Sequence, residues 1–193
     1  MADSEKSLRD RLVEVGVDLV AEEGAQALTL REIARRAGVS HGAPRRYFPT
    51  HLELLSAIAR RGFAQLADRA AAVLDGTAAD PRTRLSALGG VYLEFALGNH
   101  GMYELMFRHD LLESGHLGLR DTSLPLFGAL VGLVAEARPE ADARAVAGAL
   151  WANLHGIAQL WGWGSLQLAT DLTDFAPLLR TALDAHLGPE GGR

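Results

Sequence analysis

Cysteine is absent from the 193-residue sequence, which excludes a disulfide-stabilised fold, a thiolate zinc site and a cysteine nucleophile. Sustained alternation of apolar and polar residues is also absent, and this argues against half-buried β-strands. The first residues are polar and precede no apolar segment, so no signal peptide is expected. What remains is a chain long enough for one domain, or two small ones, with an apolar core.

The net charge of −5, taken alone, argues against a nucleic-acid partner, but its distribution along the chain does not. Residues 28–62 hold seven arginines and two carboxylates, a local charge of +5, and the excess of acidic residues lies on both sides. A local arginine cluster can neutralise phosphates on an otherwise acidic protein. The alternative is a helix face whose arginines are only solvated.

A run of 26 residues, Ala145–Thr170, contains no Asp, Glu, Lys or Arg and is long enough to span a bilayer. Asn153, His155 and Gln159 interrupt its centre, and its ends lack the basic flank that sets orientation in a membrane. We therefore favour a buried core or interface helix over a transmembrane span.

Apolar residues at three- and four-residue spacing predict an all-α protein. Thr29 and Thr50 each precede a glutamate by three residues, the spacing of a helix-capping box, and Asp80 precedes Pro81. Residues 109–120 are expected to form a loop. The predicted helices span about residues 5–23, 29–37, 50–76, 102–107, 122–137, 140–163 and 172–187, with two more opening at Ser40 and Asp80.

Two prolines bear on these boundaries. Pro44 falls in or just after the first turn of the helix that opens at Ser40, where proline is least disruptive. Pro177 falls inside the last predicted helix, which therefore either kinks or begins later than residue 172.

Residues 28–48 have the pattern of a helix-turn-helix. Ile33 and Ala34 would bury one face of the first helix, Gly38 would permit the sharp turn, and Val39 would fill the angle between the helices. The second helix would then project small, hydroxyl, imidazole and arginine side chains toward a DNA groove. A plain helical hairpin is the alternative. The exposed positions would be Ser40, His41, Gly42, Ala43, Arg45, Arg46 and Tyr47.

The first 60 residues resemble the TetR family of bacterial transcriptional regulators. The matching segments are Gly24-Ala25, Leu28–Ala34, Ala37–Ser40, Tyr47-Phe48 and Leu52–Leu55. The resemblance implies a homodimer that presents two recognition helices to a palindromic double-stranded DNA operator. It further implies that the three-helix head, residues 1–50, binds DNA and that residues 51–193 form a helical sensor and dimerisation bundle.

The resemblance also assigns contacts to individual residues. Thr29 and Arg31 would touch phosphates, and Tyr47 and His51 would hold the DNA backbone. Bases or phosphates would face Ser40, His41, Gly42, Ala43 and Arg45. Arg45 and Arg46 stand where many members have aromatic residues, and His51 replaces a lysine, so the resemblance implies DNA binding but not a particular operator sequence.

Part of the C-terminal half resembles the Trp-His-Gly subgroup of TetR-like domains through Trp151, His155 and Gly156. Trp151 and His155 are four residues apart and share a helix face. An aromatic and methionine stripe is either plain core or the lining of a pocket for an apolar or aromatic effector, with His155 as a polar orienting group. The candidate effector residues are Phe95, Met102, Met106, Phe107, Phe127, Trp151 and His155.

In this family the last two long helices usually pack into a four-helix interface between subunits, which would explain the uncharged run. Glycines would allow close helix approach and large apolar side chains would supply buried area. The candidate interface residues are Gly156, Leu160, Trp161, Trp163, Leu179 and Leu183.

Other chemistry finds little support in the sequence. His100, His109 and His116 do not share a helix face, and no phosphate loop, nucleophile elbow or metalloprotease motif is present. We therefore predict no catalytic residue, no metal and no cofactor. The predicted protein is a cytoplasmic, effector-responsive repressor; the alternative is a regulator of the same fold that activates transcription or takes no effector.

Overall fold

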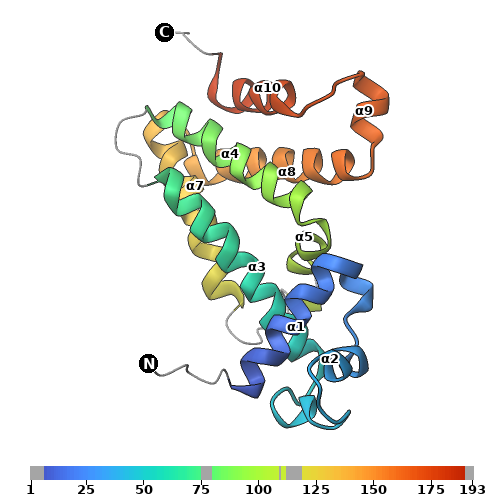
Figure 1. Ribbon diagram of the computed structural model, residues 1–193. Coiled ribbons are helices and arrows are strands. Elements are labelled where there is room, and N and C mark those ends of the chain that lie inside the picture. The colour runs from blue at the N-terminus through green and yellow to red at the C-terminus, as the bar shows by residue number, and fades with distance from the viewer. Residues whose placement is uncertain (1–6, 75–79, 109, 112–118, 190–193) are drawn as a thin grey trace, which may run out of the picture. The chain divides into compact units, whose positions relative to one another are not determined.

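The computed structural model describes residues 7–74, 80–108, 110–111 and 119–189. Within these ranges the regular structure is helical, without a strand, so the all-α prediction is confirmed (Figure 1). The chain divides into two compact units. The N-terminal unit comprises residues 1–64 and 99–122, and the C-terminal unit comprises residues 65–98 and 123–193.

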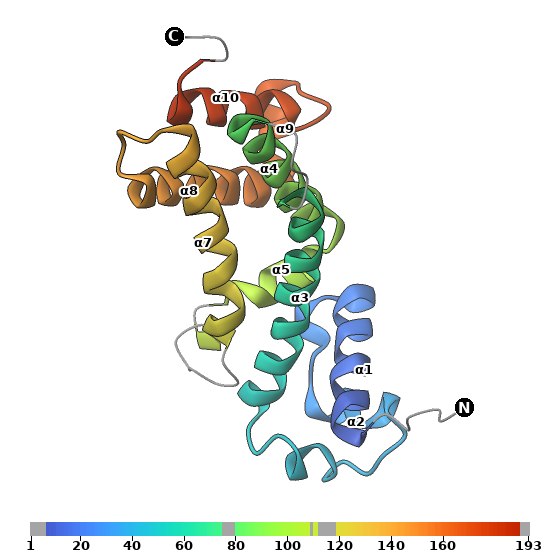
Figure 2. The same cartoon turned by 90° about the vertical axis from the view of Figure 1, so that its left-hand side faces the viewer.

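The N-terminal unit is built from α1 (Leu8–Glu23), α2 (Leu30–Arg36), the first half of α3 (His51–Leu74) and α5 (His100–Met106). Short 3₁₀ helices, η1 (Ala25–Ala27) and η2 (Pro44–Arg46), join them. α1 packs on both α2 and α5 (Figure 2). Packing thus groups α5 with the helix-turn-helix, whereas the division into residues 1–50 and 51–193 stays a prediction about function. The fully buried core includes Leu12, Leu19, Ile33, Leu54 and Ile58.

Residues adjacent to α2 in the sequence begin and end this helix, as predicted. The Thr29 hydroxyl accepts a hydrogen bond from the Glu32 N–H at 3.2 Å. At the other end Gly38 has φ of +67°, a conformation that disfavours a side chain. The Val39 and Gly38 N–H groups bond back to the carbonyls of Ala34 and Arg35, at 3.0 and 3.2 Å, which is the Schellman pattern.

The segment between α2 and α3 differs from the prediction. A helix opening at Ser40 is expected from the sequence, but the structure has turns followed by η2. In a helix capped by Ser40, Pro44 is the first residue whose N–H would bond to the Ser40 carbonyl, and proline has no N–H. The Ala43 N–H bonds to that carbonyl instead, at 2.9 Å. The predicted helix at Ser40 is therefore wrong, and Pro44, expected in or just after its first turn, instead begins η2.

The C-terminal unit contains the second half of α3, most of α7 (Leu119–Ala137), and all of α4 (Pro81–Gly98), α8 (Ala143–Gly162), α9 (Ser165–Thr170) and α10 (Ala176–Leu187). α4, α8 and α10 pack on one another (Figure 1). Their shared core includes Leu85, Leu93, Leu150, Leu154, Leu179 and Leu183.

Capping residues again define the helix starts in this unit. The Asp80 carboxylate accepts from the Arg82 N–H at 3.0 Å, and the Asp142 carboxylate caps α8. α10 begins at Ala176, whose N–H donates to the Asp174 carboxylate at 2.8 Å, with Pro177 in its first turn. The later-start alternative for this helix is thus confirmed.

The uncharged run from residue 145 to 170 does not form one helix. It covers most of α8 and all of α9, which are separated at Gly164, where φ is +76°. Over the described ranges, no helix combines the length and apolar character needed to cross a membrane.

Candidate nucleic-acid interface and aromatic cluster

The predicted DNA contacts belong to a continuous stretch of the N-terminal unit, from the start of α2 to the start of α3. Tyr47 is 42% exposed, a large share for an aromatic side chain, and Ala43 is half-buried. The exposed members of the predicted set are Thr29, Arg31, Ser40, His41, Gly42, Arg45, Arg46, Tyr47 and His51.

Two buried residues hold this stretch against the rest of the N-terminal unit. Pro44 and Phe48 are buried, and the Phe48 N–H donates to the Pro44 carbonyl at 2.9 Å. The Arg9 guanidinium of α1 lies 5.0 Å from the centre of the Phe48 ring, within the range of a cation–π contact. Arg45 and Arg46 are therefore displayed by a turn whose base is packed, although that turn is not a full α-helix.

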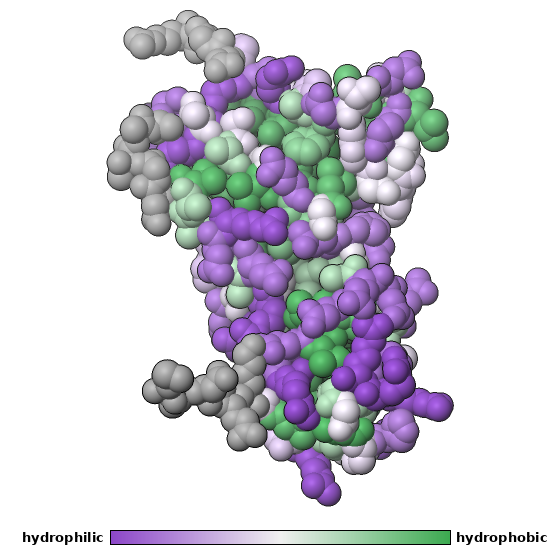
Figure 3. Space-filling model, in the orientation of Figure 1, coloured by the Kyte–Doolittle hydropathy of each residue, from purple (hydrophilic) through white to green (hydrophobic). Residues whose placement is uncertain are grey.

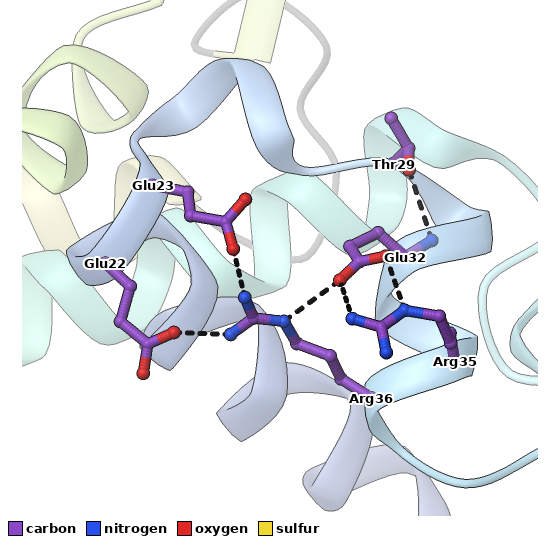
Figure 4. Close-up of polar contacts among 6 residues, drawn as sticks. All are labelled: Glu22, Glu23, Thr29, Glu32, Arg35 and Arg36. Atoms are coloured by element: carbon purple, nitrogen blue, oxygen red, sulfur yellow. Dashed lines mark hydrogen bonds and ion pairs between the residues drawn. The ribbon is translucent and has the colours of Figure 1, made fainter.

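The arginines of α2 are engaged with carboxylates of the protein (Figure 4). Arg35 makes a two-pronged contact with Glu32, at 2.8 and 2.5 Å. Arg36 contacts three carboxylates: Glu32 at 3.0 Å, Glu22 at 2.5 Å, and Glu23. Because Glu22 and Glu23 end α1, Arg36 ties the end of α1 to the end of α2.

This network changes the electrostatics inferred from the sequence. The Arg35 hydrogen bond, followed by that of Arg36, lowers the pKa of Glu32 from 4.5 to about 2. Folding brings Glu22 and Glu23, which lie outside the basic window in the sequence, into contact with Arg36 inside it. The sequence signal missed this pairing because the two glutamates lie outside the window. The other exposed arginines of the window are Arg31, Arg45, Arg46, Arg60 and Arg61.

His51, predicted to touch the DNA backbone, has an intramolecular partner. Its Nε2 atom lies 2.6 Å from the carbonyl oxygen of Leu28. A carbonyl oxygen only accepts, so Nε2 carries the hydrogen. His51 thus joins the first residue of α3 to the segment that leads into α2.

The predicted effector residues are distributed over both units. In the N-terminal unit, Met102 and Met106 are buried and pack against Gly62, where an added Cβ would lie 2.7 and 2.6 Å from their sulfur atoms. Phe107 contacts Phe63 edge-on, with 5.6 Å between ring centres. In the C-terminal unit, Phe95 is fully buried.

The other three effector candidates form one cluster in the C-terminal unit. The ring of Trp151 lies 6.0 Å from Phe127 and 6.1 Å from His155. Tyr92 of α4, which the sequence analysis did not select, lies between them: its hydroxyl is 3.3 Å from the Trp151 Nε1 atom and 3.0 Å from His155 Nδ1. Burial lowers the pKa of His155 below its ordinary value of 6.5. We call Tyr92, Phe127, Trp151 and His155 the aromatic cluster.

A separate cleft of about 430 Å³ lies between α4 and α10. Arg82, which is hydrogen-bonded to the Gly188 carbonyl at 2.5 Å and paired with Asp184, forms part of its wall. None of the predicted effector residues lines this cleft. The lining residues are Arg82, Thr83, Ser86, Ala87, Arg180, Leu183 and Asp184.

The predicted dimer residues fall into two groups. Leu160 and Trp163 are 40% and 64% exposed, which is unusual for large apolar side chains. Leu179 and Leu183 are buried within the single chain, and Gly156 and Trp161 are half-buried. Figure 3 shows hydrophobic surface over α4 and α10 of this unit. Leu168 of α9, outside the predicted set, is 87% exposed.

Metal ligation finds no geometric support in the part of the chain that the structure describes, where no three His, Asp or Glu side chains converge. Of the three histidines considered from the sequence, His109 and His116 lie outside the described residues. His100 of α5 lies 3.3 Å from Glu104, one helical turn away.

Sequence comparison matches both halves of the chain to known families. A profile described as "Bacterial regulatory proteins, tetR family" matches residues 12–58, and one described as "Tetracyclin repressor-like, C-terminal domain" matches residues 85–184. The Trp-His-Gly subgroup is not named by these matches and stays a prediction.

Individual relatives agree with the profiles. The HTH-type transcriptional regulator BetI of Rhizobium meliloti is 40% identical over 80 residues, which are 42% of this chain and 39% of that protein. The HTH-type transcriptional repressor Rv3405c of Mycobacterium tuberculosis is 29% identical over 183 residues, covering 93% of this chain and 80% of the repressor. A solved structure of a protein of unknown function from Rhodococcus sp. RHA1 is 28% identical, with a TM-score of 0.81 over 97% of both chains.

Proposed function

We propose that this chain, which belongs to the tetR family of bacterial regulatory proteins, is a homodimeric repressor that a small aromatic effector releases from a palindromic operator. It would act in the cytoplasm. The observation that carries the DNA part is the packed turn of residues 40–48, with Arg45, Arg46 and Tyr47 exposed on it.

The chemistry of this turn suits a DNA groove. Arginine pairs with two acceptors of guanine or with phosphate, and the Thr29 side chain and Arg31 at the start of α2 would contact phosphates. Arg45 and Arg46 are adjacent in sequence and therefore point in different directions from the chain. One of them is expected to read a base edge and the other to hold the backbone.

Dimerisation through the last helices supplies the second half-site. The exposed side chains of Leu160 and Trp163 lie at the end of α8, and covering them would remove apolar area from water. Leu179 and Leu183 would support this surface from within the protomer. An operator with two-fold symmetry then matches two identical heads.

The aromatic cluster is the proposed effector site. Trp151 is 39% exposed and its ring contacts Phe127 and His155, so the cluster offers an aromatic surface with one polar end. Effector binding would favour a conformation in which the two heads no longer match the half-site spacing. A preference of ~3 kcal/mol for that conformation would weaken operator binding by about a hundredfold.

Selection of bound fragments from the source genome tests the proposal. The expected outcome is a short palindromic sequence whose affinity falls steeply with salt, and which sits beside the regulated genes. Transcription from that promoter should rise when the gene for this protein is deleted. A fall in transcription would instead identify an activator, and no enriched sequence at all would refute the operator.

A further inference from the structure

The cleft between α4 and α10 shares no residue with the aromatic cluster or with the predicted DNA contacts. Its volume of about 430 Å³ is in the range of small-molecule sites, and its lining residues all belong to the C-terminal unit. Arg82 near the start of α4 contacts Asp184 late in α10, whereas an added Cβ at Gly89, further along α4, would lie 2.7 Å from the Cδ1 atom of Leu179, early in α10. The two helices therefore run in opposite directions along the cleft (Figure 1).

The polar groups at one end of this cleft are engaged within the protein. Arg82 donates to the Gly188 carbonyl at 2.5 Å and pairs with Asp184. The Thr83 hydroxyl donates its hydrogen to the Asp80 carboxylate at 2.5 Å. The side chains of Arg82, Thr83 and Asp184 therefore have little remaining capacity to hold a ligand.

Two other polar groups of the lining differ from these. Within the described residues, neither the Ser86 hydroxyl nor the Arg180 guanidinium makes a hydrogen bond or an ion pair. Asp184 follows Arg180 by one helical turn and could pair with it, but the Asp184 carboxylate is bound by Arg82 from α4. The lining holds two arginines and one aspartate, so one positive charge is left, on the same cleft as an available hydroxyl.

The chemistry of the lining favours one class of ligand. The parallel N–H groups of an arginine match the two oxygens of a carboxylate, and a serine hydroxyl can donate to the same group. Leu183 and Ala87 supply apolar surface in the same cleft. A single excess charge beside apolar surface suits a monoanion with a short hydrocarbon body better than a dianion such as phosphate.

We propose that this cleft is a second ligand site, which binds a small monocarboxylate through Arg180 and Ser86 with its hydrocarbon part against Leu183 and Ala87. The proposal goes beyond the regulatory function, because it requires neither the operator nor the aromatic cluster. Binding at the cleft is measured without DNA, so its failure and the failure of the regulatory proposal are distinguishable.

Titration with sodium butanoate, followed by amide NMR of the full-length protein, tests the ligand class. Sodium chloride at equal ionic strength is the reference for general salt effects. Butanoate should give saturable shifts of amides in residues 82–87 and 180–184. Inorganic phosphate, and n-butanol, which has the same chain length without the charge, should each bind about tenfold more weakly or less tightly still. No saturable shift with butanoate, or equal binding of phosphate or n-butanol, would overturn the ligand class.

Three variants test the residues. Arg180→Ala should weaken butanoate binding by about tenfold, as expected when a charged hydrogen-bond partner is lost, and Ser86→Ala should weaken it severalfold. Arg144→Ala is the matched control, since Arg144 is an exposed arginine of the same unit that does not line the cleft. Wild-type affinity in Arg180→Ala, or an equal loss in Arg144→Ala, would overturn the site. Wild-type affinity in Ser86→Ala would overturn the part assigned to the hydroxyl.

Discussion

The His51 side chain donates a hydrogen bond from Nε2 to the carbonyl oxygen of Leu28, at 2.6 Å, and so closes the start of α3 onto the segment before α2. This contact gives His51 a structural role in addition to the predicted DNA contact. His51→Ala should lower the free energy of unfolding by about 1 kcal/mol, the usual value of one hydrogen bond. The measurement is urea denaturation followed by circular dichroism.

His51→Gln separates the two roles, since the glutamine amide retains a donor of similar reach. It should recover most of the stability that His51→Ala loses. Operator affinity in His51→Gln then reports the DNA contact alone. If His51→Ala unfolds at the same urea concentration as the wild type, the tie to Leu28 contributes nothing measurable.

The Glu32 network predicts a defined pH dependence. Arginine contacts lower the pKa of Glu32 to about 2 in the folded chain, against 4.5 in the unfolded one. Its stabilisation is therefore present above pH 4.5 and is lost as the pH falls toward 2. The difference in unfolding free energy between wild type and Glu32→Gln should be largest above pH 4.5 and shrink on acidification.

Glu53→Gln is the control for this comparison, because Glu53 occupies the same position after the Thr50 cap of α3. It measures the effect of a carboxylate at a helix start without the two arginines. A pH-independent difference between wild type and Glu32→Gln would contradict the arginine contacts seen in Figure 4.

Salt dependence should distinguish the arginines that face DNA from those that the protein itself binds. Replacing Arg45 or Arg46 by alanine should cost about 1–3 kcal/mol of operator binding if that arginine reads a base. If it holds a phosphate, the replacement should reduce the salt slope, which is the slope of log affinity against log salt concentration, by about 1. Arg35→Ala should leave the salt slope unchanged, because its guanidinium is bound to Glu32. Fluorescence anisotropy over a salt series provides the measurement, and an equal loss of slope in all three variants would refute the distinction.

Much of the fold was predictable from the sequence because the deciding groups are neighbours in it. Thr29 and Thr50 cap helices three residues upstream of their glutamates, and Gly38 ends α2 with a positive φ. The reciprocal half of the first capping box does not form: the Thr29 N–H bonds to the Ala27 carbonyl at 2.7 Å, and Glu32 turns to Arg35 and Arg36. The arginine contacts of Glu32 thus replace the second hydrogen bond of the capping box. The residue types alone do not show which of these two interactions forms.

The parts that could not be predicted depend on long-range contacts. Tyr92 is 63 residues from His155, and nothing in the spacing of either residue pairs them. Leu179 and Leu183 have the same apolar character as Leu160, yet they are buried within the chain while Leu160 is 40% exposed. Periodicity predicts that such residues lie on an apolar face. It does not determine whether that face meets α4 of the same chain or another subunit.

The exposed apolar side chains at the end of α8 predict that substitutions there will dissociate the proposed dimer. Leu160→Glu and Trp163→Arg should convert the proposed dimer to a monomer, since each places a charge on apolar surface that the partner would cover. Leu168→Glu is the control: Leu168 is 87% exposed but lies on α9, outside the predicted interface. Sedimentation velocity measures the oligomeric state of each variant. Dissociation by Leu168→Glu alone would indicate that α9, and not the end of α8, forms the interface.

Pro44→Ala tests why the recognition segment is a turn and not a helix. Alanine restores the N–H that could bond to the Ser40 carbonyl, so residues 40–48 should gain helix, measured by amide exchange and circular dichroism. Gly42→Ala is the matched control, because an added Cβ at Gly42 meets nothing within 4 Å and raises helix propensity by about 1 kcal/mol without restoring that bond. If the missing hydrogen bond decides the structure, Pro44→Ala should form more helix than Gly42→Ala. If Gly42→Ala forms as much helix, backbone entropy and not the proline determines the turn.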